Sequence, residues 1–104
     1  MIYDYRGHFS FNHNSISQNA ADDHGVYYCG YIDTENKLQP LYIGRAIGDY
    51  VSIKSRLLEH YADRKWPDVT SFGFQVCTTK AEAEQLEQDR IKEFQPKYNQ
   101  VGKI

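Results

Sequence analysis

Residues 26–44 have the sequence VYYCGYIDTENKLQPLYIG, and this stretch decides the fold. Its first seven residues are rich in β-branched and aromatic side chains, which favour a strand. The polar run at 33–36 is typical of a turn, and residues 41–44 then resume the strand pattern. The stretch therefore predicts two paired strands joined by a turn.

Two helices and a third strand are predicted beyond these strands. Gly48 and Asp49 favour a helix start, and large side chains recur after them at helical spacing, at positions 50, 53, 57 and 61. Apolar residues alternate over 72–76, which indicates a strand. Thr79 and Glu82 form a capping-box pattern before a second helix, which should end before Pro96. This order predicts an α+β fold with a three-stranded, mainly antiparallel sheet flanked by helices.

The first 24 residues stand apart from this pattern. We expect them to form an N-terminal arm or extra element, and residues 25–104 to form the functional domain. The polar stretch 12–24 predicts a loop or a mobile arm. Aromatic side chains at alternate positions, 3 and 5 and then 9 and 11, leave open a second interpretation, in which this segment adds a strand or covers a sheet edge.

Composition and charge narrow the function classes. The chain has 104 residues and a formal net charge of -2, so it is not a protein that coats nucleic acid indiscriminately. Residues 1–41 hold two basic and five acidic residues, whereas residues 42–104 hold ten and nine, so a local cationic patch is expected in the second part. Neither a membrane-spanning run nor a signal-peptide core is present in the sequence, which predicts a cytoplasmic protein with no membrane partner.

The two cysteines are expected to be free. Cys29 and Cys77 both fall in apolar, strand-like stretches, where a thiol usually behaves as a small hydrophobic group. A zinc site also needs more ligands than these two cysteines supply at this spacing.

Glu87 falls on the core-facing side of the second predicted helix. On a helical wheel it lies between Phe94 and Ile91, where an unpaired carboxylate is costly. Two interpretations stay open. Glu87 forms an ion pair with Arg56 or Arg90, or it is a ligand for a hard divalent cation.

Arg56 and His60 are four residues apart, so they share one face of the first predicted helix. Each alone would be interpreted as a solvated basic side chain, but together they resemble a phosphate clamp. The chain also has nine tyrosines, most of which are expected simply to pack with their hydroxyls hydrogen-bonded. Tyr27 and Tyr42 differ because they lie on two strands that pair.

These residues resemble the pattern of a known family. Gly25-Val26-Tyr27 followed by Tyr42-Ile43-Gly44 is similar to the paired signature of the GIY-YIG nuclease superfamily, which includes homing endonucleases and the incision subunit of bacterial nucleotide excision repair. The rest of the family pattern follows in order, with Arg45, Arg56, His60, Glu87 and Pro96-Lys97-Tyr98-Asn99. The resemblance covers about residues 25–99.

The resemblance implies a nuclease that uses one divalent ion, Mg²⁺ or Mn²⁺, to hydrolyse a nucleic-acid phosphodiester, with DNA expected rather than RNA. It implies that Glu87 holds the ion and that Arg56 neutralises charge on the phosphate. Tyr27 or Tyr42 would activate the attacking water, and the other would orient the water or the phosphate.

The remaining family positions would support these groups. A tyrosine base needs its phenolate stabilised, and Arg45, His60 and the metal are candidates for that task. Asn99 would tie the C-terminal segment to the active-site scaffold through its amide.

Substrate contact is expected from basic and aromatic side chains near the first predicted helix. The candidates are Lys54 and an exposed loop that carries Arg64, Lys65 and Trp66. Two alternatives on the same fold stay open, a nucleic-acid-binding module that does not cut and a protein-interaction domain that uses the acidic first part. The small domain is expected to act alone, as a homodimer or with a targeting partner.

Overall fold

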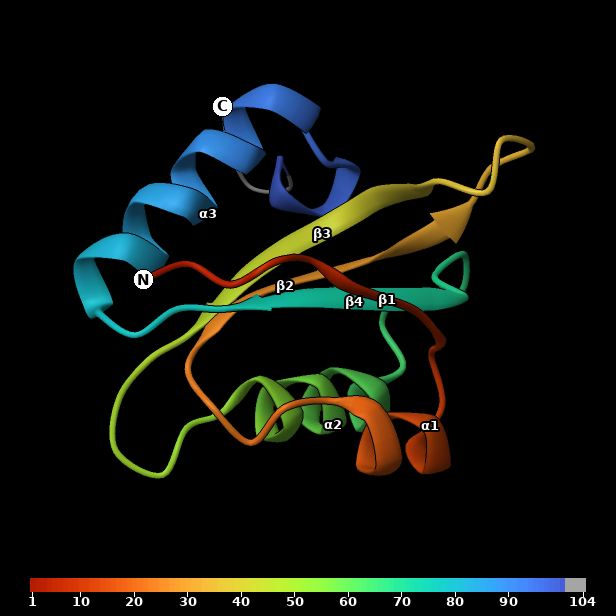
Figure 1. Cartoon of the computed structure of the whole chain (residues 1–104). Coiled ribbons are helices and arrows are strands. Elements are labelled where there is room, and N and C mark those ends of the chain that lie inside the picture. The colour runs from red at the N-terminus through yellow and green to blue at the C-terminus, as the bar shows by residue number, and fades with distance from the viewer. Residues whose placement is uncertain (101–104) are drawn as a thin grey trace.

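A computed structural model of the chain describes residues 1–100, and they form an α+β fold with an antiparallel sheet of four strands (Figure 1). The elements in chain order are β1 (Arg6–Ser10), α1 (His13–Asn19), β2 (Gly25–Ile32), β3 (Leu38–Ala46), α2 (Ile53–Asp63), β4 (Ser71–Val76), α3 (Lys80–Phe94) and the 3-10 helix η1 (Lys97–Asn99). The last four positions of the predicted domain, 101–104, lie outside the described residues.

The strands lie in the order β1-β4-β2-β3, and each neighbouring pair is antiparallel. β2 and β3 form the predicted hairpin, in which Tyr27 is opposite Gly44 and Cys29 is opposite Tyr42. The connecting loop covers residues 33–37, and the ladder shifts register between Cys29 and Gly30. β3 is therefore an edge strand of the sheet.

The prediction of three strands was wrong by one, because β1 pairs with β4 at the other edge of the sheet. The interpretation in which the aromatic N-terminus adds a strand is confirmed. Phe9 of β1 packs on two rings of β4, with centroid distances of 5.4 Å to Phe72 and 6.2 Å to Phe74. These aromatic contacts hold β1 in the sheet.

The prediction of a loop or arm over 12–24 was wrong for residues 13–19, which form α1. Asn12 caps this short helix by accepting a hydrogen bond from the Ser15 backbone N–H at 2.9 Å. Ile16 is its one fully buried side chain, and it enters the core between the sheet and α2. A single apolar anchor in a polar sequence was too weak a periodic signal to predict the helix.

The first long helix begins later than predicted. α2 starts at Ile53, where Ser52 and Ser55 form a reciprocal capping box. The preceding loop holds Gly48 and Tyr50 at positive φ, and Tyr50 is fully exposed rather than on the helix stripe. The start and end predicted for α3 are confirmed, with the Thr79–Glu82 capping box present and the helix ending at Phe94.

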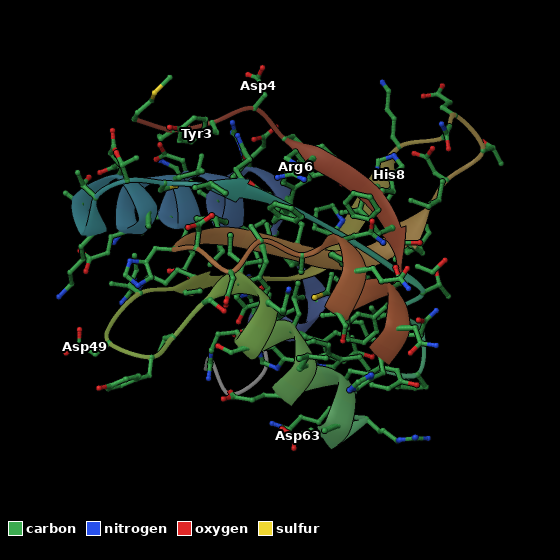
Figure 2. The ribbon with its side chains drawn as sticks, turned by 60° about the horizontal axis from the view of Figure 1, so that its bottom comes forward. Tyr3, Asp4, Arg6, His8, Asp49 and Asp63 are labelled. Atoms are coloured by element: carbon green, nitrogen blue, oxygen red, sulfur yellow. The ribbon has the colours of Figure 1, made fainter. Side chains whose placement is uncertain are left out.

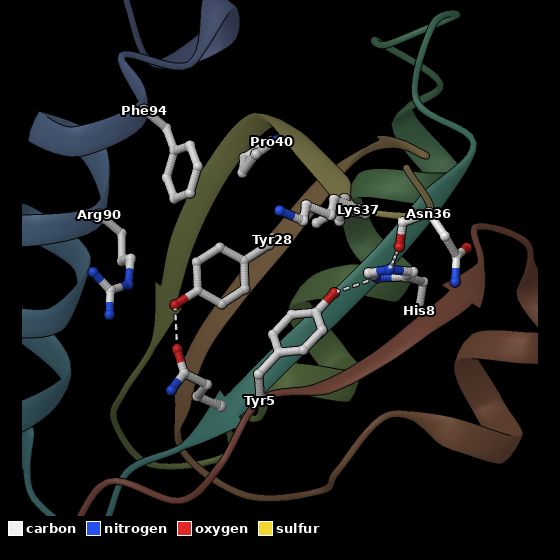
Figure 3. A pocket seen from close by; sticks show the side chains of 10 residues that line it. Tyr5, His8, Tyr28, Asn36, Lys37, Pro40, Arg90 and Phe94 are labelled. Atoms are coloured by element: carbon white, nitrogen blue, oxygen red, sulfur yellow. Dashed lines mark hydrogen bonds between the residues drawn. The ribbon is translucent and has the colours of Figure 1, made fainter. Parts of the chain in front are cut away.

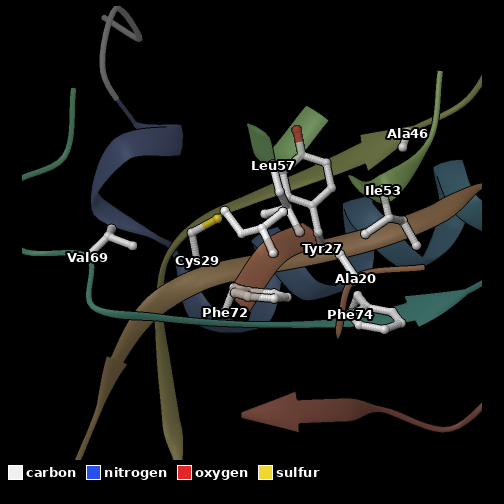
Figure 4. Close-up of a cluster of buried hydrophobic side chains, with 10 residues drawn as sticks. Ala20, Tyr27, Cys29, Ala46, Ile53, Leu57, Val69, Phe72 and Phe74 are labelled. Atoms are coloured by element: carbon white, nitrogen blue, oxygen red, sulfur yellow. The ribbon is translucent and has the colours of Figure 1, made fainter. Parts of the chain in front are cut away.

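The sheet separates two hydrophobic clusters. On one side, a cluster lies between the sheet and helices α1 and α2 and includes Tyr27, Ile53, Leu57, Phe72 and Phe74 (Figure 4). On the other side α3 covers a smaller cluster that includes Val26, Tyr28, Ile43, Ala83 and Leu86. The two helical layers lie on opposite sides of the sheet (Figure 1). Cys29 belongs to the first cluster and Cys77 to the second, and both are free, as predicted.

Charged side chains lie on the outside of these layers. In Figure 2, Asp49 lies on the loop before α2, Asp63 at the end of α2, and Asp4 beside the N-terminal strand, all pointing away from the ribbon. Within residues 1–100, none of the helices has both the length and the apolar character needed to cross a bilayer.

Ile16→Ala tests whether the N-terminal segment is part of the folded unit. Because Ile16 is fully buried, we expect the free energy of unfolding to fall by about 2–5 kcal/mol in a denaturant titration. Ile2→Ala is the matched control, since Ile2 is 42% exposed and its truncation should cost much less. Equal, small losses in the two variants would contradict an anchoring role for α1.

Candidate active site at the β3 edge

The edge strand β3 presents two sets of family-pattern residues to opposite faces of the sheet. Successive side chains on a strand alternate between faces. Tyr42 and Gly44 therefore face the α2 side with Tyr27, which is opposite Gly44 in the ladder. Ile43 and Arg45 face the α3 side. The candidate site is divided across one edge strand rather than enclosed in one pocket.

Tyr27 lies directly on Gly44. Tyr27 is fully buried, and a Cβ at position 44 would lie only 2.5 Å from its ring and hydroxyl. Any other residue at position 44 would displace the ring. The Tyr27 hydroxyl is 2.9 Å from Nε2 of His60, which α2 presents to the same face. The paired tripeptides thus place a buried tyrosine against the helix.

An aromatic stack extends from Tyr27 towards the solvent. The Tyr42 and Trp66 rings are stacked at a centroid distance of 4.7 Å, and the His60 ring lies 4.6 Å from Trp66. Tyr98 stacks on Trp66 at 5.7 Å. Trp66 is partly buried by these contacts, so the prediction that it is exposed was wrong. We call Tyr27, Tyr42, His60, Trp66 and Tyr98 the aromatic cluster.

Burial and Arg56 act in opposite directions on the tyrosine hydroxyls. Burial raises the pKa of Tyr27 well above its usual value, and burial together with the charge of Glu87 raises the pKa of Tyr42. The positive charge of Arg56 lowers both. Arg56 is therefore the cation whose charge favours a phenolate, a task for which Arg45, His60 and the metal were the sequence candidates. Its Nη1 also donates to Glu59 Oε2 at 2.8 Å.

His60 is held in its neutral form. Burial, together with the positive charges of Arg56 and Lys65, lowers the pKa of His60 to about 4. A neutral imidazole has one protonated and one unprotonated ring nitrogen, and its tautomer sets whether Nε2 accepts from the Tyr27 hydroxyl or donates to it. The pair is therefore a buried phenol hydrogen-bonded to an imidazole that carries no charge at neutral pH.

Glu87 forms an ion pair across the α3 side of the edge. Nη1 of Arg45 donates to Glu87 Oε1 at 3.0 Å, and the Glu87 side chain is only 17% exposed. Burial raises the pKa of Glu87, and the charge of Arg45 opposes that effect. The ion-pair interpretation is confirmed, but the partners predicted for it, Arg56 and Arg90, were wrong.

Glu87 is a single carboxylate rather than part of a ready-made metal cage. Among residues 1–100, no group of three or more His, Cys, Asp or Glu side chains is arranged to hold a metal ion. The charge of Glu87 nevertheless reaches the Tyr42 hydroxyl, where it raises the pKa. The carboxylate and the aromatic cluster are thus neighbours around the β3 edge.

Asn99 clamps the edge strand from η1. Its Oδ1 accepts from the Ile43 backbone N–H at 2.8 Å, and its Nδ2 donates to the Ile43 carbonyl at 2.9 Å. The amide hydrogen bonds expected from Asn99 are therefore present. They fix the backbone between Tyr42 and Gly44, where both parts of the site meet.

The basic residues proposed for substrate contact are not all together. Arg64 and Lys65 are exposed at the end of α2, next to Trp66. The guanidinium of Arg64 lies 5.7 Å from the Tyr61 ring, and Lys65 Nζ is 3.6 Å from Asp63. Lys54 lies in the first turn of α2, and its side chain leaves the helix on roughly the opposite side from Arg56. Lys54 also lies at the opposite end of α2 from Arg64 and Lys65, so it is separated from the other contact candidates.

Lys97 and Tyr98 belong to the C-terminal motif but had no task of their own in the sequence interpretation. The Tyr98 hydroxyl donates to Asp68 Oδ1 at 2.6 Å, and Lys97 Nζ lies 3.0 Å from Asp68 Oδ2. These bonds tie η1 to the loop that carries Trp66. Tyr98 was visible as an aromatic residue in the C-terminal motif, but its stacking on Trp66 depends on contacts distant in sequence.

The comparisons with known proteins assign no family to this arrangement. No protein-family model matches the sequence, and no curated protein matches it significantly.

The depressed pKa of His60 predicts a pH-dependent stability. Unfolded His60 binds a proton near pH 6.5, whereas folded His60 resists protonation until about pH 4. Lowering the pH through this window therefore favours the unfolded state. The stabilisation that comes from keeping His60 neutral is fully present only above pH 6.5. We expect the free energy of unfolding to fall less between pH 7 and pH 5 in His60→Gln than in the unmodified protein. Identical pH dependence in denaturant titrations would contradict this account.

Proposed function

We propose that the chain is a divalent-metal-dependent endonuclease of the GIY-YIG type, which hydrolyses phosphodiester bonds in nucleic acid and prefers DNA to RNA. The observation that carries the proposal is the convergence of Tyr42, the Tyr27–His60 pair and Arg56 on one face of the β3 edge, with Glu87 at the same edge from α3. Each group has a separate task in phosphodiester hydrolysis.

The site fits a cation that takes few protein ligands. Mg²⁺ keeps several water ligands and commonly binds through one or two carboxylates together with substrate phosphate. Glu87 supplies one such carboxylate, partly buried at the edge, and Arg45 is its present partner. When bound, the ion would polarise the scissile phosphate and stabilise the leaving oxygen.

Tyr42 is the residue we assign to the attacking water. Tyr27 is fully buried, whereas Tyr42 is only partly buried at the outer side of the pair. The Tyr27 hydroxyl lowers the pKa of Tyr42, and Tyr27 itself is held by His60 Nε2. In this assignment Tyr42 acts as the phenolate, which the positive charge of Arg56 favours, and takes one proton from the water while Tyr27 and His60 orient its oxygen. The water oxygen then forms a bond to phosphorus, the ester P–O bond breaks, and the leaving oxygen takes up a proton from solvent.

Arg56 is the residue we assign to the phosphate. A guanidinium binds two phosphate oxygens in a planar fork, which suits charge that develops during the reaction. Its present partner Glu59 is largely exposed, and exposed ion pairs contribute little to stability. Substrate phosphate can therefore replace Glu59 at small cost.

One observation favours the alternative of a nucleic-acid-binding module that does not cut. Arg45 already forms an ion pair with Glu87, so the carboxylate charge is neutralised without a metal ion. In that case the basic loop with Arg64 and Lys65 would contact phosphates, and the site would have no hydrolytic role. A cleavage assay separates the two functions.

Glu87→Gln tests the proposed function. We expect cleavage of labelled single-stranded, duplex or branched DNA in Mg²⁺ or Mn²⁺ to fall by at least about a hundredfold, because the variant loses the carboxylate that binds the ion. Glu84→Gln is the matched control, since Glu84 lies on the same helix and pairs with Lys80. It should cleave like the unmodified protein.

The outcomes separate the candidates. Cleavage that persists in Glu87→Gln or in the presence of a chelator would point to a contaminating nuclease and count against the proposal. Binding of DNA by the unmodified protein without cleavage of any of these substrates, or of the corresponding RNAs, would favour the binding module.

Trp66→Ala should weaken substrate binding and also slow the reaction. Stacking of one base on an aromatic ring is worth on the order of tenfold in affinity, so the apparent KM should rise by about that factor. Trp66 also packs on Tyr42 and His60, so kcat should fall as well. Steady-state cleavage kinetics would measure both, and an unchanged KM would contradict contact between Trp66 and substrate.

A further inference from the structure

A second feature lies on the α3 side of the sheet, away from the aromatic cluster. It is a pocket of about 330 Å³, bounded by β1, β2, β4, the β2–β3 hairpin and the end of α3 (Figure 3). Its lining includes Tyr5, Lys37, Tyr28, Gln75, Arg90 and Phe94. The volume is at the lower end of the range for small-molecule sites, which fits one small planar group rather than a large ligand.

Hydrogen bonds fix the walls of this pocket. The Tyr28 hydroxyl donates to Gln75 Oε1 at 2.5 Å. The Tyr5 hydroxyl lies 2.9 Å from His8 Nδ1, and His8 Nε2 lies 2.8 Å from the Asn36 carbonyl, which links β1 to the hairpin loop (Figure 3). The pocket is therefore formed before any ligand binds.

A glycine lets the Tyr5 ring form one of these walls. A Cβ on Gly73 of β4 would lie 2.0 Å from the Tyr5 hydroxyl, so the ring lies flat on the sheet only because position 73 has no side chain. The Tyr5 and Tyr28 rings are 5.8 Å apart and inclined at 56°. Together with Phe94, which is 40% exposed, they offer aromatic surface to a ligand.

Two cations border the aromatic surface. Arg90 lies close enough to the Tyr28 hydroxyl to lower its pKa, although burial still raises that pKa to about 12. Lys37 reaches the pocket from the hairpin loop (Figure 3). Arg90 pairs with Glu93 at 2.8 Å and Lys37 with Glu35 at 4.0 Å, and all four side chains are substantially exposed. Such pairs are weak, so an anionic ligand can displace the carboxylates.

The pocket is adjacent to the proposed catalytic edge. Arg90 follows Glu87 by three residues on α3, and side chains at that spacing are neighbours on a helix surface. A nucleic-acid strand whose phosphate lies at Glu87 would therefore have a nearby nucleotide within reach of Arg90. Because Glu87 and Arg90 are neighbours on α3, we relate the pocket to the nucleic-acid strand proposed to bind at Glu87.

We propose that this pocket binds one unpaired nucleotide of a nucleic-acid strand, with its base against Tyr28 and Phe94 and its phosphate at Arg90 and Lys37. Stacking on aromatic rings does not depend on the base, and a guanidinium with a nearby ammonium binds a phosphate. A base inside a duplex must first be unpaired and unstacked before it can enter such a pocket, whereas a single-stranded base avoids that cost. The inference rests on the proposed function and narrows its substrate to nucleic acid with a single-stranded segment.

Direct binding tests this proposal without relying on cleavage. A short fluorescently labelled oligothymidylate is titrated with Glu87→Gln protein in chelator, and affinity is measured by anisotropy. Arg90→Ala and Phe94→Ala, each added to this background, should weaken binding by about tenfold, the loss of one charge-assisted or stacking contact. Lys92→Ala removes a positive charge from the same helix, and Tyr50→Ala removes an exposed aromatic ring elsewhere. Neither residue lines the pocket, so both controls should bind as the background does.

A second measurement locates the nucleotide. Thymidine 5′-monophosphate titrated into isotope-labelled protein should shift the NMR signals of Tyr28, Gln75 and Arg90. Equal affinity of the pocket variants and the controls, or shifts confined to the aromatic cluster, would overturn the inference. These outcomes are distinct from a failure of the proposed function, because a protein that cleaves normally in both pocket variants would remain a nuclease without this pocket site. Pocket-dependent binding by a protein that does not cleave would support the nucleotide site alone.

Discussion

The rest of the structure depends on the antiparallel register of β2 with β3, in which Tyr27 crosses Gly44. A slip by one residue would move every side chain of β3 to the other face of the sheet. Tyr42 would leave the α2 face, and Arg45 would lose Glu87 on α3. Gly44 makes the register specific, because its lack of a side chain leaves room for the buried Tyr27 ring, whose hydroxyl is hydrogen-bonded to His60.

Much of the fold and the positions of the site residues were predictable from local patterns. The hairpin, β4 and α3 each carry a strong periodic or capping signal within a few residues, and all three are present. Arg56 and His60 share a helix face because they are four residues apart, and they do act on the same pair of tyrosines. These features depend on geometry within one element, which a sequence encodes directly.

The parts that were missed depend on contacts between distant segments. β1 is a strand because Phe9 meets two rings of β4, and α1 is a helix because one isoleucine finds a place between the sheet and α2. The ion pair of Glu87 with Arg45 depends on which face of β3 meets α3, which a helical wheel alone does not reveal. Trp66 is partly buried for the same reason, since the rings that cover it come from β3, α2 and η1.

The hydrogen bonds from Asn99 also affect whether strands of other molecules can pair with the edge strand β3. An edge strand with free backbone groups is a template for strands of other molecules, and natural sheets protect such edges in various ways. Here a side-chain amide takes up both the N–H and the carbonyl of Ile43, in the middle of β3. A foreign strand cannot extend the ladder past that point without displacing Asn99. The amide that holds the β3 edge in place therefore also protects this edge against amyloid-like association.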